Sequence, residues 1–423
     1  MKIAKASLID PDRNAVYATA AVALSFFVFA YSSRFGQISI LAYYGLWLPL
    51  VLVDYRRVLG HPGRSLWIFA FAMLCFLSSF WSAAPGVSFR ASIQYLTHVL
   101  CALIILRTVS VPTLVKGALI GCLIVLVYSK LFGYYAYDPM DGTYSFVGAF
   151  SSKNQLGFYA SLGLLFTYCA VMVLKLPLLW LGIAGVTGAL SGYSIFASQS
   201  ATSVLTTFAI LAAVLGLQVL CRLTPNIRKL IFFGGLIIAV LGINAALAGG
   251  AADAILGLFG KDSTLTGRTY LWAQGMEAAR MHPAFGIGYQ AYWVKGFADA
   301  ERLWEAFYIT SRSGFHFHNT YIETTVETGF VGLLILIVTL LTPLFVNLKR
   351  ILHDARNPEA KVMFAISALL LVRSFVEIDV IFPYQVGSFL MFFAAGQISL
   401  RRRSIPLNPI AMRDIQAHRV RLA

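Results

Sequence analysis

The stretch "GFVGLLILIVTLLTPLFV" (residues 329–346) contains no charged residue and is long enough to cross a bilayer as a helix. Similar runs recur along the 423-residue chain, of which 59% is hydrophobic and only 12% is charged. One soluble core cannot bury so much apolar surface. The sequence therefore predicts an all-α polytopic membrane protein.

We expect about twelve transmembrane helices and one large extracytoplasmic loop that contains short helices. The first span follows Lys2, Lys5 and Arg13 and no small-residue cleavage site comes after it, so a retained signal anchor is expected. The expected spans are 15–31, 37–53, 66–80, 93–109, 112–132, 155–174, 177–196, 202–221, 230–248, 323–346, 362–381 and 383–399. The expected divisions are helices 1–9 (1–248), the periplasmic loop (249–322), helices 10–12 (323–399) and a basic cytoplasmic tail (400–423).

The basic residues predict the orientation. If the N-terminus is cytoplasmic, most of the 33 lysines and arginines fall in cytoplasmic segments, as the positive-inside rule requires. Both termini are then cytoplasmic. The net charge of +15 is mostly a consequence of this topology, and its dispersal over short loops argues against nucleic acid as a partner. The five cysteines form no CxxC pair and are expected to be packing residues.

The 249–322 loop runs against this charge pattern. Two explanations stay open: the cations hold an anionic ligand at the outer surface, or they are simply solvated, since long loops translocate regardless of charge. A structureless loop of this length is uncommon unless it has a function. The six basic residues are Lys261, Arg268, Arg280, Lys295, Arg302 and Arg312.

Within the loop, "TLTGRTYLWAQGMEAARMHP" (264–283) predicts a surface helix of about 14 residues, capped by Thr266 and closed by Pro283. Arg268 falls in its first turn, where free backbone N–H groups and the helix dipole favour an anion. A cation there does not help the helix, so Arg268 is expected to be a ligand. The following "FGIGYQAYW" (285–293) completes no nucleotide-binding motif and indicates a tight turn packed by aromatic residues.

Polar residues gather in "HFHNTYIETTVE" (316–327). A helical metal site needs ligands at i and i+4, but Ile322 follows His318 at that spacing; a His-x-His pair on a strand with Glu323 remains an alternative. Thr320 and Glu323 match a capping box, which predicts that a membrane helix begins here. His318 then lies at the outer interface, where the positive helix end favours the neutral imidazole of a general base. The alternative is an interfacial histidine without chemistry.

Three further carboxylates lie in or near membrane spans. Glu327, one turn beyond Glu323, needs a partner or water. In "RSFVEID" (373–379), Arg373 and Glu377 stand at i and i+4 and can pair with each other, with Glu327 or with the loop. The sequence leaves the roles of Glu377 and Asp379 open.

A resemblance covers most of the chain in order. "DSTLTGRTYLW", "HPAFGIGYQAYW" and "HFHNTYIETTVETGFVGLL" resemble the conserved region of the O-antigen ligase and Wzy-type polymerase superfamily of bacterial envelope glycosyltransferases. "WSAAPGVSFRAS" (81–92), "GAFSSKNQLG" (148–157) and "ASQSATSVL" (197–205) are similar to segments of its exopolysaccharide-polymerase branch. One departure is Ala201, where many relatives carry a basic residue.

The resemblance implies a glycosyltransferase of the bacterial inner membrane that works on the periplasmic face without a metal or other cofactor. By motif match, Arg268 binds the diphosphate of an undecaprenyl-diphosphate-linked glycan donor and His318 is the base that activates the glycan acceptor. Lys153 is expected to replace the contact missing at Ala201. The expected substrate-binding residues are Lys153, Arg90, Asn154, Asn319, Arg280, Glu327 and Arg373. Membrane lipids, a chain-length regulator and export machinery are the other expected partners.

The predicted activity is the polymerisation of lipid-linked oligosaccharide repeats into exopolysaccharide or O-antigen, with inversion at the anomeric carbon. The first alternative is an O-antigen ligase that transfers the glycan to lipid A core or another acceptor with the same residues. A flippase or transporter fits less well, because no internal repeat is evident and polar residues gather at the outer ends of the spans.

Overall fold

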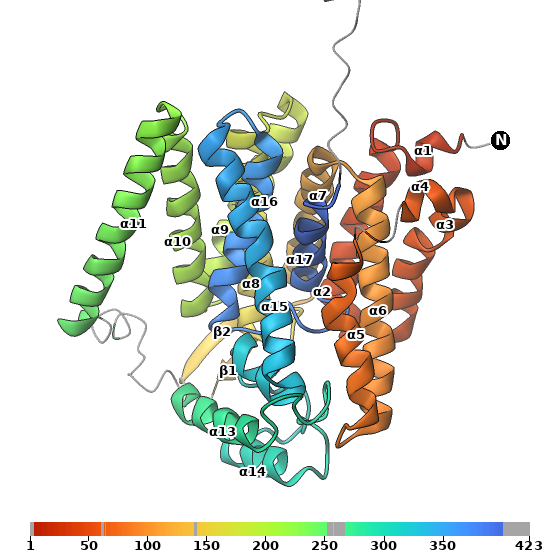
Figure 1. The fold of residues 1–423 in the computed structure, drawn as a ribbon, viewed down its shortest axis with the longest axis vertical. Helices are drawn as coiled ribbons and strands as arrows, with labels where there is room; N and C mark the ends of the chain where they lie inside the picture. Colours follow the sequence, from red (N-terminus) through yellow and green to blue (C-terminus); the bar gives the residue numbers. More distant parts are fainter. Residues whose placement is uncertain are drawn as a thin grey trace, which may run out of the picture.

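The computed structural model describes residues 4–60, 63, 65–138, 142–251, 257 and 267–400. Long helices run side by side along the longest axis of the molecule (Figure 1). The first helices, α1 and α4, lie at one end of this bundle, and α13 and α14 lie at the other. We call the end with α13 and α14 the site end and the other the opposite end.

The helices and strands follow one another with short connections. In the first half they are α1 (Ala6–Ile9), α2 (Ala15–Trp47), α3 (Pro49–Val53), α4 (Tyr55–Leu59), η2 (Leu66–Phe69), α5 (Ala70–Leu77), η3 (Ser78–Phe80), α6 (Pro85–Thr108), α7 (Val111–Phe132), β1 (Tyr134–Asp138), β2 (Thr143–Gly148), α8 (Lys153–Tyr168) and η4 (Cys169–Val173). In the second half they are α9 (Leu178–Ala197), α10 (Ala201–Leu220), α11 (Pro225–Ala248), α13 (Arg268–Met281), α14 (Ala298–Ala306), α15 (Thr320–His353), α16 (Pro358–Ser374) and α17 (Val386–Gln397).

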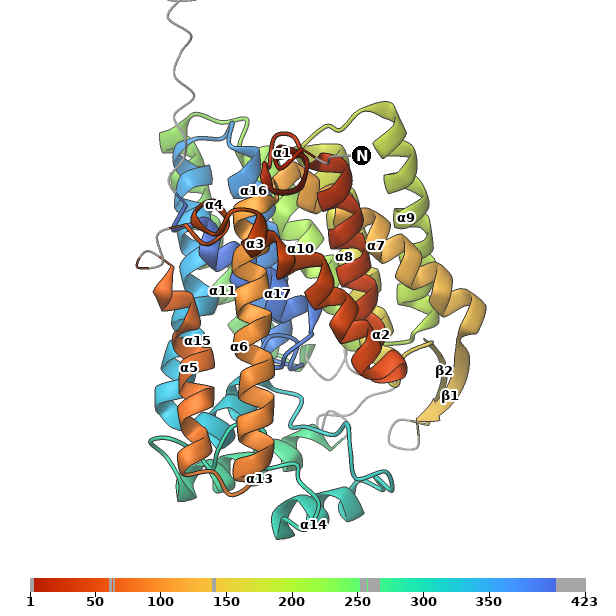
Figure 2. The same ribbon diagram turned by 90° about the vertical axis from the view of Figure 1, so that its right-hand side faces the viewer.

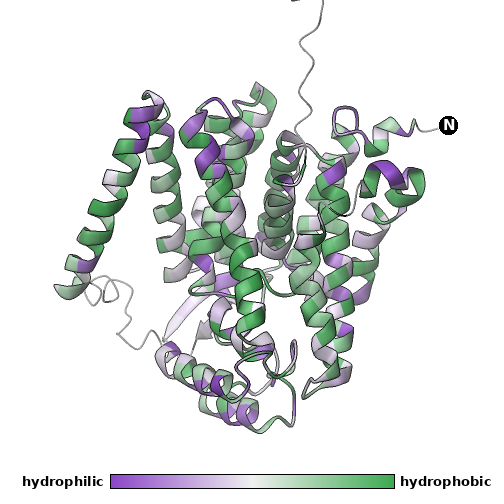
Figure 3. Cartoon of the chain, viewed as in Figure 1, coloured by the Kyte–Doolittle hydropathy of each residue, from purple (hydrophilic) through white to green (hydrophobic). Residues whose placement is uncertain are grey.

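The structure confirms a polytopic helical membrane protein. Within the described residues, eight helical stretches are long and apolar enough to cross a bilayer, and two further apolar helices are shorter. Apolar residues dominate the middle of the bundle while hydrophilic residues gather at both ends (Figure 3). Each predicted span overlaps a helix of the structure, but the number of twelve crossings stays a prediction.

The first of these eight stretches, Ala15–Val53, contains a reversal of the chain. Gly36 has φ +61°, a value that interrupts a right-handed helix and that glycine adopts without a steric penalty. The rings of Phe29 and Tyr43, on either side of it, lie 5.0 Å apart. Trp47 donates a hydrogen bond to the Ser25 hydroxyl at 2.9 Å, so the two arms pack side by side.

The hairpin of β1 and β2 is the one sheet in the described residues, and its strands pair antiparallel. It lies toward the site end, beside the chain that leads into α8 (Figure 2). The sequence prediction of an all-α protein missed it. Its outward strand alternates Tyr135 and Tyr137, which are exposed and match the alternation of a strand rather than the period of a helix.

Helix α15 breaks at Gly329, and the break holds the segment before α14 in place. Gly329 has φ +67° and ψ −171°, so the helical hydrogen bonds around it cannot form. The freed N–H groups of residues 330 and 331 donate to the carbonyls of Pro283 and Ala284 at 2.8 and 3.2 Å. The freed carbonyls of residues 326 and 327 accept from the N–H groups of residues 287 and 288 at 3.1 and 2.9 Å. The predicted tight turn at 285–288 is therefore confirmed, and it is clamped to a membrane helix.

We expect Gly329→Ala to destabilise the protein, because a side chain at Gly329 would strain the backbone and collide with the Ala284 carbonyl. The strain alone costs about 2 kcal/mol. The measurement is the melting temperature of the purified protein in detergent, which should fall by several degrees. Gly242→Ala is the matched control, since nothing lies within 4 Å of an added methyl group there. Equal melting temperatures for the two variants would contradict the clamp.

Candidate functional site

The carboxylate of Glu377 joins four segments that are distant in sequence. Its Oε1 accepts hydrogen bonds from the Asn154 amide at 2.7 Å and from the Arg268 guanidinium at 3.1 Å. Its Oε2 lies 3.4 Å from Nδ1 of His318. The Thr320 hydroxyl donates to the Glu377 backbone carbonyl. The two residues singled out as catalytic, His318 and Arg268, therefore meet at one acid.

Glu377 is available because α16 ends earlier than predicted. The predicted span 362–381 is wrong at its end: the helix stops at Ser374, and residues 376–380 are irregular. Arg373 consequently does not pair with Glu377 at i+4. Its Nε donates to Asp379 at 2.6 Å and its guanidinium lies over the Phe158 ring at 4.2 Å. This buried pair folds the loop back on the helix end and leaves Glu377 facing the site.

Glu377 carries a negative charge in this setting. Burial by itself raises the pKa of its carboxyl, but the neighbouring His318 and Arg268 outweigh burial and hold the pKa below its ordinary value of 4.5. An ionised carboxylate accepts strong hydrogen bonds from a guanidinium and an imidazole. The acid can therefore orient both groups at neutral pH.

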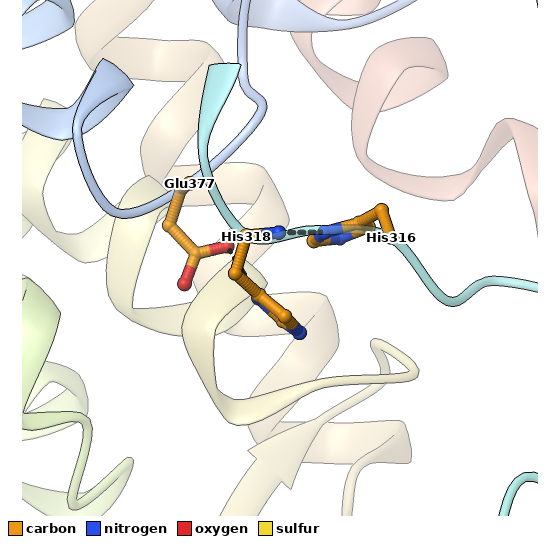
Figure 4. Close-up of side chains that lie close together, drawn as sticks. All are labelled: His316, His318 and Glu377. Atoms are coloured by element: carbon orange, nitrogen blue, oxygen red, sulfur yellow. Dashed lines mark hydrogen bonds and ion pairs between the residues drawn. The ribbon is translucent and has the colours of Figure 1, made fainter. Parts of the chain in front are cut away.

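His318 sits on an extended segment just before α15 and points its imidazole at Glu377 (Figure 4). Its φ is +52°, which is uncommon for a residue other than glycine and is typically held in place by the surrounding contacts. The side chain keeps 24% of its surface exposed, so an outside group can reach it.

His316 supports His318 from behind. Its Nδ1 accepts a hydrogen bond from the His318 backbone N–H at 3.1 Å, and the two rings lie 4.2 Å apart. Burial, with the nearby cations of the site, lowers the pKa of His316 well below its ordinary value. A neutral ring is what the accepting Nδ1 requires. This geometry fits the supporting role that the sequence left open.

Asn319 caps α15, which corrects the predicted capping box. The Asn319 side chain accepts from the backbone N–H groups of Tyr321 and Ile322, so the helix begins at Thr320. Glu323 is then one position too far along to complete a box. It accepts instead from the Phe317 N–H at 2.8 Å and from the Trp293 indole at 2.9 Å, which fixes the strand that carries the histidines.

The metal alternative changes its third ligand. Glu323 is engaged elsewhere, whereas ligand atoms of His316, His318 and Glu377 lie within 4.8 Å of one another. The Nδ1 of His316 is used by the backbone, and the guanidinium of Arg268 already lies on the same carboxylate. A cation beside Glu377 disfavours a second, divalent cation there. The set therefore fits a hydrogen-bonded triad better than a metal site.

Helix α13 confirms the predicted surface helix and its length. It runs from Arg268 to Met281, with Gly267 before it; the predicted cap, Thr266, lies outside the described residues, as does Lys261. Arg268 reaches from its first turn to the loop after α16, where NH1 donates to the Val376 carbonyl at 2.7 Å. The guanidinium is thus held at two points and presents its remaining N–H groups toward the site end.

Two upstream motifs also reach the site. Asn154, at the start of α8, contacts Glu377 and accepts from the Ser200 hydroxyl at 2.8 Å. Ser200 caps α10 directly before Ala201. Lys153 donates to the Thr143 hydroxyl of β2 at 2.8 Å. The motifs "KN" and "SQS" therefore lie together beside Glu377, and the replacement of a phosphate contact by Lys153 stays a prediction.

The other predicted substrate-binding residues lie apart from Glu377. Arg90 is exposed on α6, and Arg280 is exposed at the far end of α13 from Arg268. Glu327 is buried in α15 beside the clamp. Asn319 donates its amide to the Phe375 carbonyl and so joins the loop to the helix start. Their contacts with substrate remain predictions.

Two cations of the outer segment have local partners: Arg312 pairs with Glu301, and Arg302 with Gln274 and Asp299. Three of the four aromatic residues considered for sugar stacking, Tyr289, Tyr292 and Trp304, are fully buried and serve packing. Of the four, Trp293 is partly exposed and lies near the histidine strand.

Comparison with known proteins agrees with this arrangement. A family model described as O-antigen ligase matches residues 186–337, which hold Arg268 and His318. The exopolysaccharide production protein ExoQ of Rhizobium meliloti (strain 1021) is 59% identical over 403 residues, which cover 95% of this chain and 93% of ExoQ. The chain belongs to the O-antigen ligase and Wzy superfamily, in its exopolysaccharide branch. For this superfamily member, a lipid-linked glycan is the implied substrate class.

Sequence analysis alone did not assign Glu377, which binds the catalytic candidates of this superfamily member together. One signal was available: an acid in a mostly apolar stretch needs a partner and marks a functional position. The helical spacing to Arg373 pointed to the wrong partner, because the helix ends between them.

The depressed pKa of Glu377 predicts a pH-dependent contribution to stability. A carboxyl whose pKa is lower in the folded than in the unfolded state stabilises the fold above the unfolded value and loses this effect as pH falls through the folded value. We expect Glu377→Gln to lower the melting temperature near pH 7 and the difference from wild type to shrink below pH 4.5. Melting curves of both proteins between pH 7 and pH 3 check this. A difference that grows toward low pH would contradict an ionised Glu377.

Proposed function

We propose that the protein is a glycosyltransferase that polymerises undecaprenyl-diphosphate-linked repeat units on the periplasmic face of the bacterial inner membrane. The observation that supports it most directly is the meeting of His318 and Arg268 at Glu377. A base and a phosphate-binding cation on opposite sides of one carboxylate suit a displacement of diphosphate from a sugar carbon.

In the proposed reaction, His318 accepts the proton of the acceptor hydroxyl. Its Nδ1 faces Glu377, which leaves Nε2 for the acceptor. As the acceptor oxygen bonds to the anomeric carbon, the imidazole becomes an imidazolium, and the nearby carboxylate stabilises the new charge. Direct attack inverts the anomeric configuration.

Arg268 stabilises the leaving group. The bond between the anomeric carbon and the diphosphate oxygen breaks, and the diphosphate leaves on its undecaprenyl carrier with the bonding electron pair. A guanidinium matches phosphate oxygens with two parallel N–H donors, and it cannot lose its proton at neutral pH. The Val376 carbonyl and Glu377 hold Arg268 in place beforehand, so little reorganisation is needed during the reaction.

A ligase is the second candidate function, because the matching family model is described as O-antigen ligase. A ligase would use His318 and Arg268 in the same way, with lipid A core or another acceptor in place of a second lipid-linked glycan. The polymerase is favoured by the 59% identity to an exopolysaccharide production protein.

We expect His318→Ala to reduce polymer formation about 100-fold or more, which is the usual size of the effect of a general base. The measurement is conversion of lipid-linked repeats to high-molecular-weight polymer by purified protein, with membrane abundance checked in parallel. His282→Ala is the matched control, since this exposed histidine lies at the end of α13 away from Arg268. Wild-type polymer from His318→Ala would overturn the assignment, and complete loss of activity with a chelator would favour the metal alternative.

Arg268→Lys should also lose most activity, because a lysine keeps the charge but cannot bridge Glu377, Val376 and a phosphate together. The same polymer assay checks this, with the Michaelis constant for the lipid-linked donor measured separately. A variant with an unchanged turnover number would contradict the role in leaving-group stabilisation.

Deletion of the gene distinguishes the two candidate functions. Loss of a polymerase should leave single lipid-linked repeats, whereas loss of a ligase should leave full-length lipid-linked chains. Lipid extracts from the deletion strain, separated by chain length, measure the outcome. Full-length chains would overturn the polymerase assignment and leave the site chemistry unchanged.

A further inference from the structure

A second polar pocket lies at the opposite end of the bundle. It has a volume of about 490 Å³ and opens where α10, α11 and α15 end or begin. Its lining includes Arg222, Arg228, Arg356, Lys361, Asp354 and Gln218. The pocket therefore holds four permanent cations against one acid, and no step of the proposed transferase reaction uses it.

Arg228 forms the fixed part of this pocket. Its side chain is 4% exposed, and it donates to the backbone carbonyls of Ile351, Leu352 and Leu223 at 2.9 to 3.2 Å. Its buried Nε has no hydrogen-bond partner in the described structure. Carbonyl oxygens satisfy donors but do not neutralise a full positive charge. A buried cation without an acid creates a strong positive potential in the pocket.

The other cations stand around the opening. Arg222 and Arg356 are exposed, and they come from opposite walls, after α10 and between α15 and α16. Lys361 is partly buried and donates to the Gln218 amide oxygen at 3.0 Å. An anion of the size of a phosphodiester can therefore contact charged groups from several sides.

Apolar residues continue from the same pocket toward the middle of the bundle. Tyr168, Val214, Leu217 and Phe364 line an adjoining recess that shares Gln218, Cys221 and Lys361 with the cationic pocket. Because α10 and α11 are candidate membrane spans joined by residues 221–224, the pocket lies at the level of a bilayer surface. Charged groups above an apolar recess match a headgroup above its acyl chain.

We propose that this pocket binds the phosphate of an anionic phospholipid from the surrounding bilayer. Basic pockets between membrane helices bind such headgroups through phosphate contacts. A soluble phosphate would use the cations but leave the apolar recess unused, so the lipid fits the whole pocket better. The exposed arginines are expected to add binding energy, while Arg228 sets the position of the phosphate.

The test measures binding of dioleoyl phosphatidylglycerol to the purified full-length protein in detergent by native mass spectrometry. The variant is R222Q/R356Q, which removes two exposed cations without touching buried Arg228. The matched control is R13Q/R56Q, which removes two exposed cations near α1 and α4 at the same end of the molecule. Melting temperatures of all three proteins confirm that each is folded.

We expect phosphatidylglycerol to bind R222Q/R356Q about thirty-fold more weakly than wild type, since each arginine near an anionic surface contributes about five-fold. The control should stay within about two-fold, and phosphatidylcholine should bind all three proteins weakly. Equal losses in both double variants would overturn the pocket and indicate surface charge alone. Displacement of the lipid by millimolar inorganic phosphate would overturn the lipid as the occupant. If R222Q/R356Q fails to fold, the single variant R356Q should show about a five-fold loss, and wild-type binding by it would overturn the proposal.

Discussion

The buried carboxylate of Glu377 is the constraint on which the site depends. A charged acid removed from water must be paired, and here its partners come from the starts of α8 and α13 and from the segment before α15. Each partner is thereby drawn to one point at the end of the bundle. The acid performs a structural task and a chemical one at once: it joins the outer segment to the membrane helices, and it orients the imidazole and the guanidinium.

The membrane character of the chain was predictable because long apolar runs have few alternatives in water or lipid. Arg268 at the first turn of a surface helix was predictable from its cap and closing proline. The meeting of His318 with Glu377 was not, because it depends on where α16 ends, and a run such as "RSFVEID" has no proline or glycine to mark that end. The partner of Arg373 was missed for the same reason: a shift of the helix end by a few residues exchanges Glu377 for Asp379.

The reactive groups lie on irregular chain, and regular structure holds that chain from both sides. His318 has a left-handed backbone, between a helix cap at Asn319 and a strand fixed by Glu323. The turn at 285–288 uses the hydrogen bonds that α15 releases at Gly329. Irregular backbone at the end of a membrane bundle is tolerated where its polar groups are paired within the protein. The site therefore has the accessibility of a loop and the fixed geometry of a helix.

Helix α11 presents a different balance. Its most apolar 18-residue window has no buried residue, whereas Arg228 near its start is held by the end carbonyls of α15. Along most of this helix, selection can act only on length and hydrophobicity, since lipid accepts one aliphatic side chain as readily as another. Its sequence is thus free to drift among descendants of a common ancestor, with Arg228 as the fixed point, while a change at Glu377 would require simultaneous changes in three other segments.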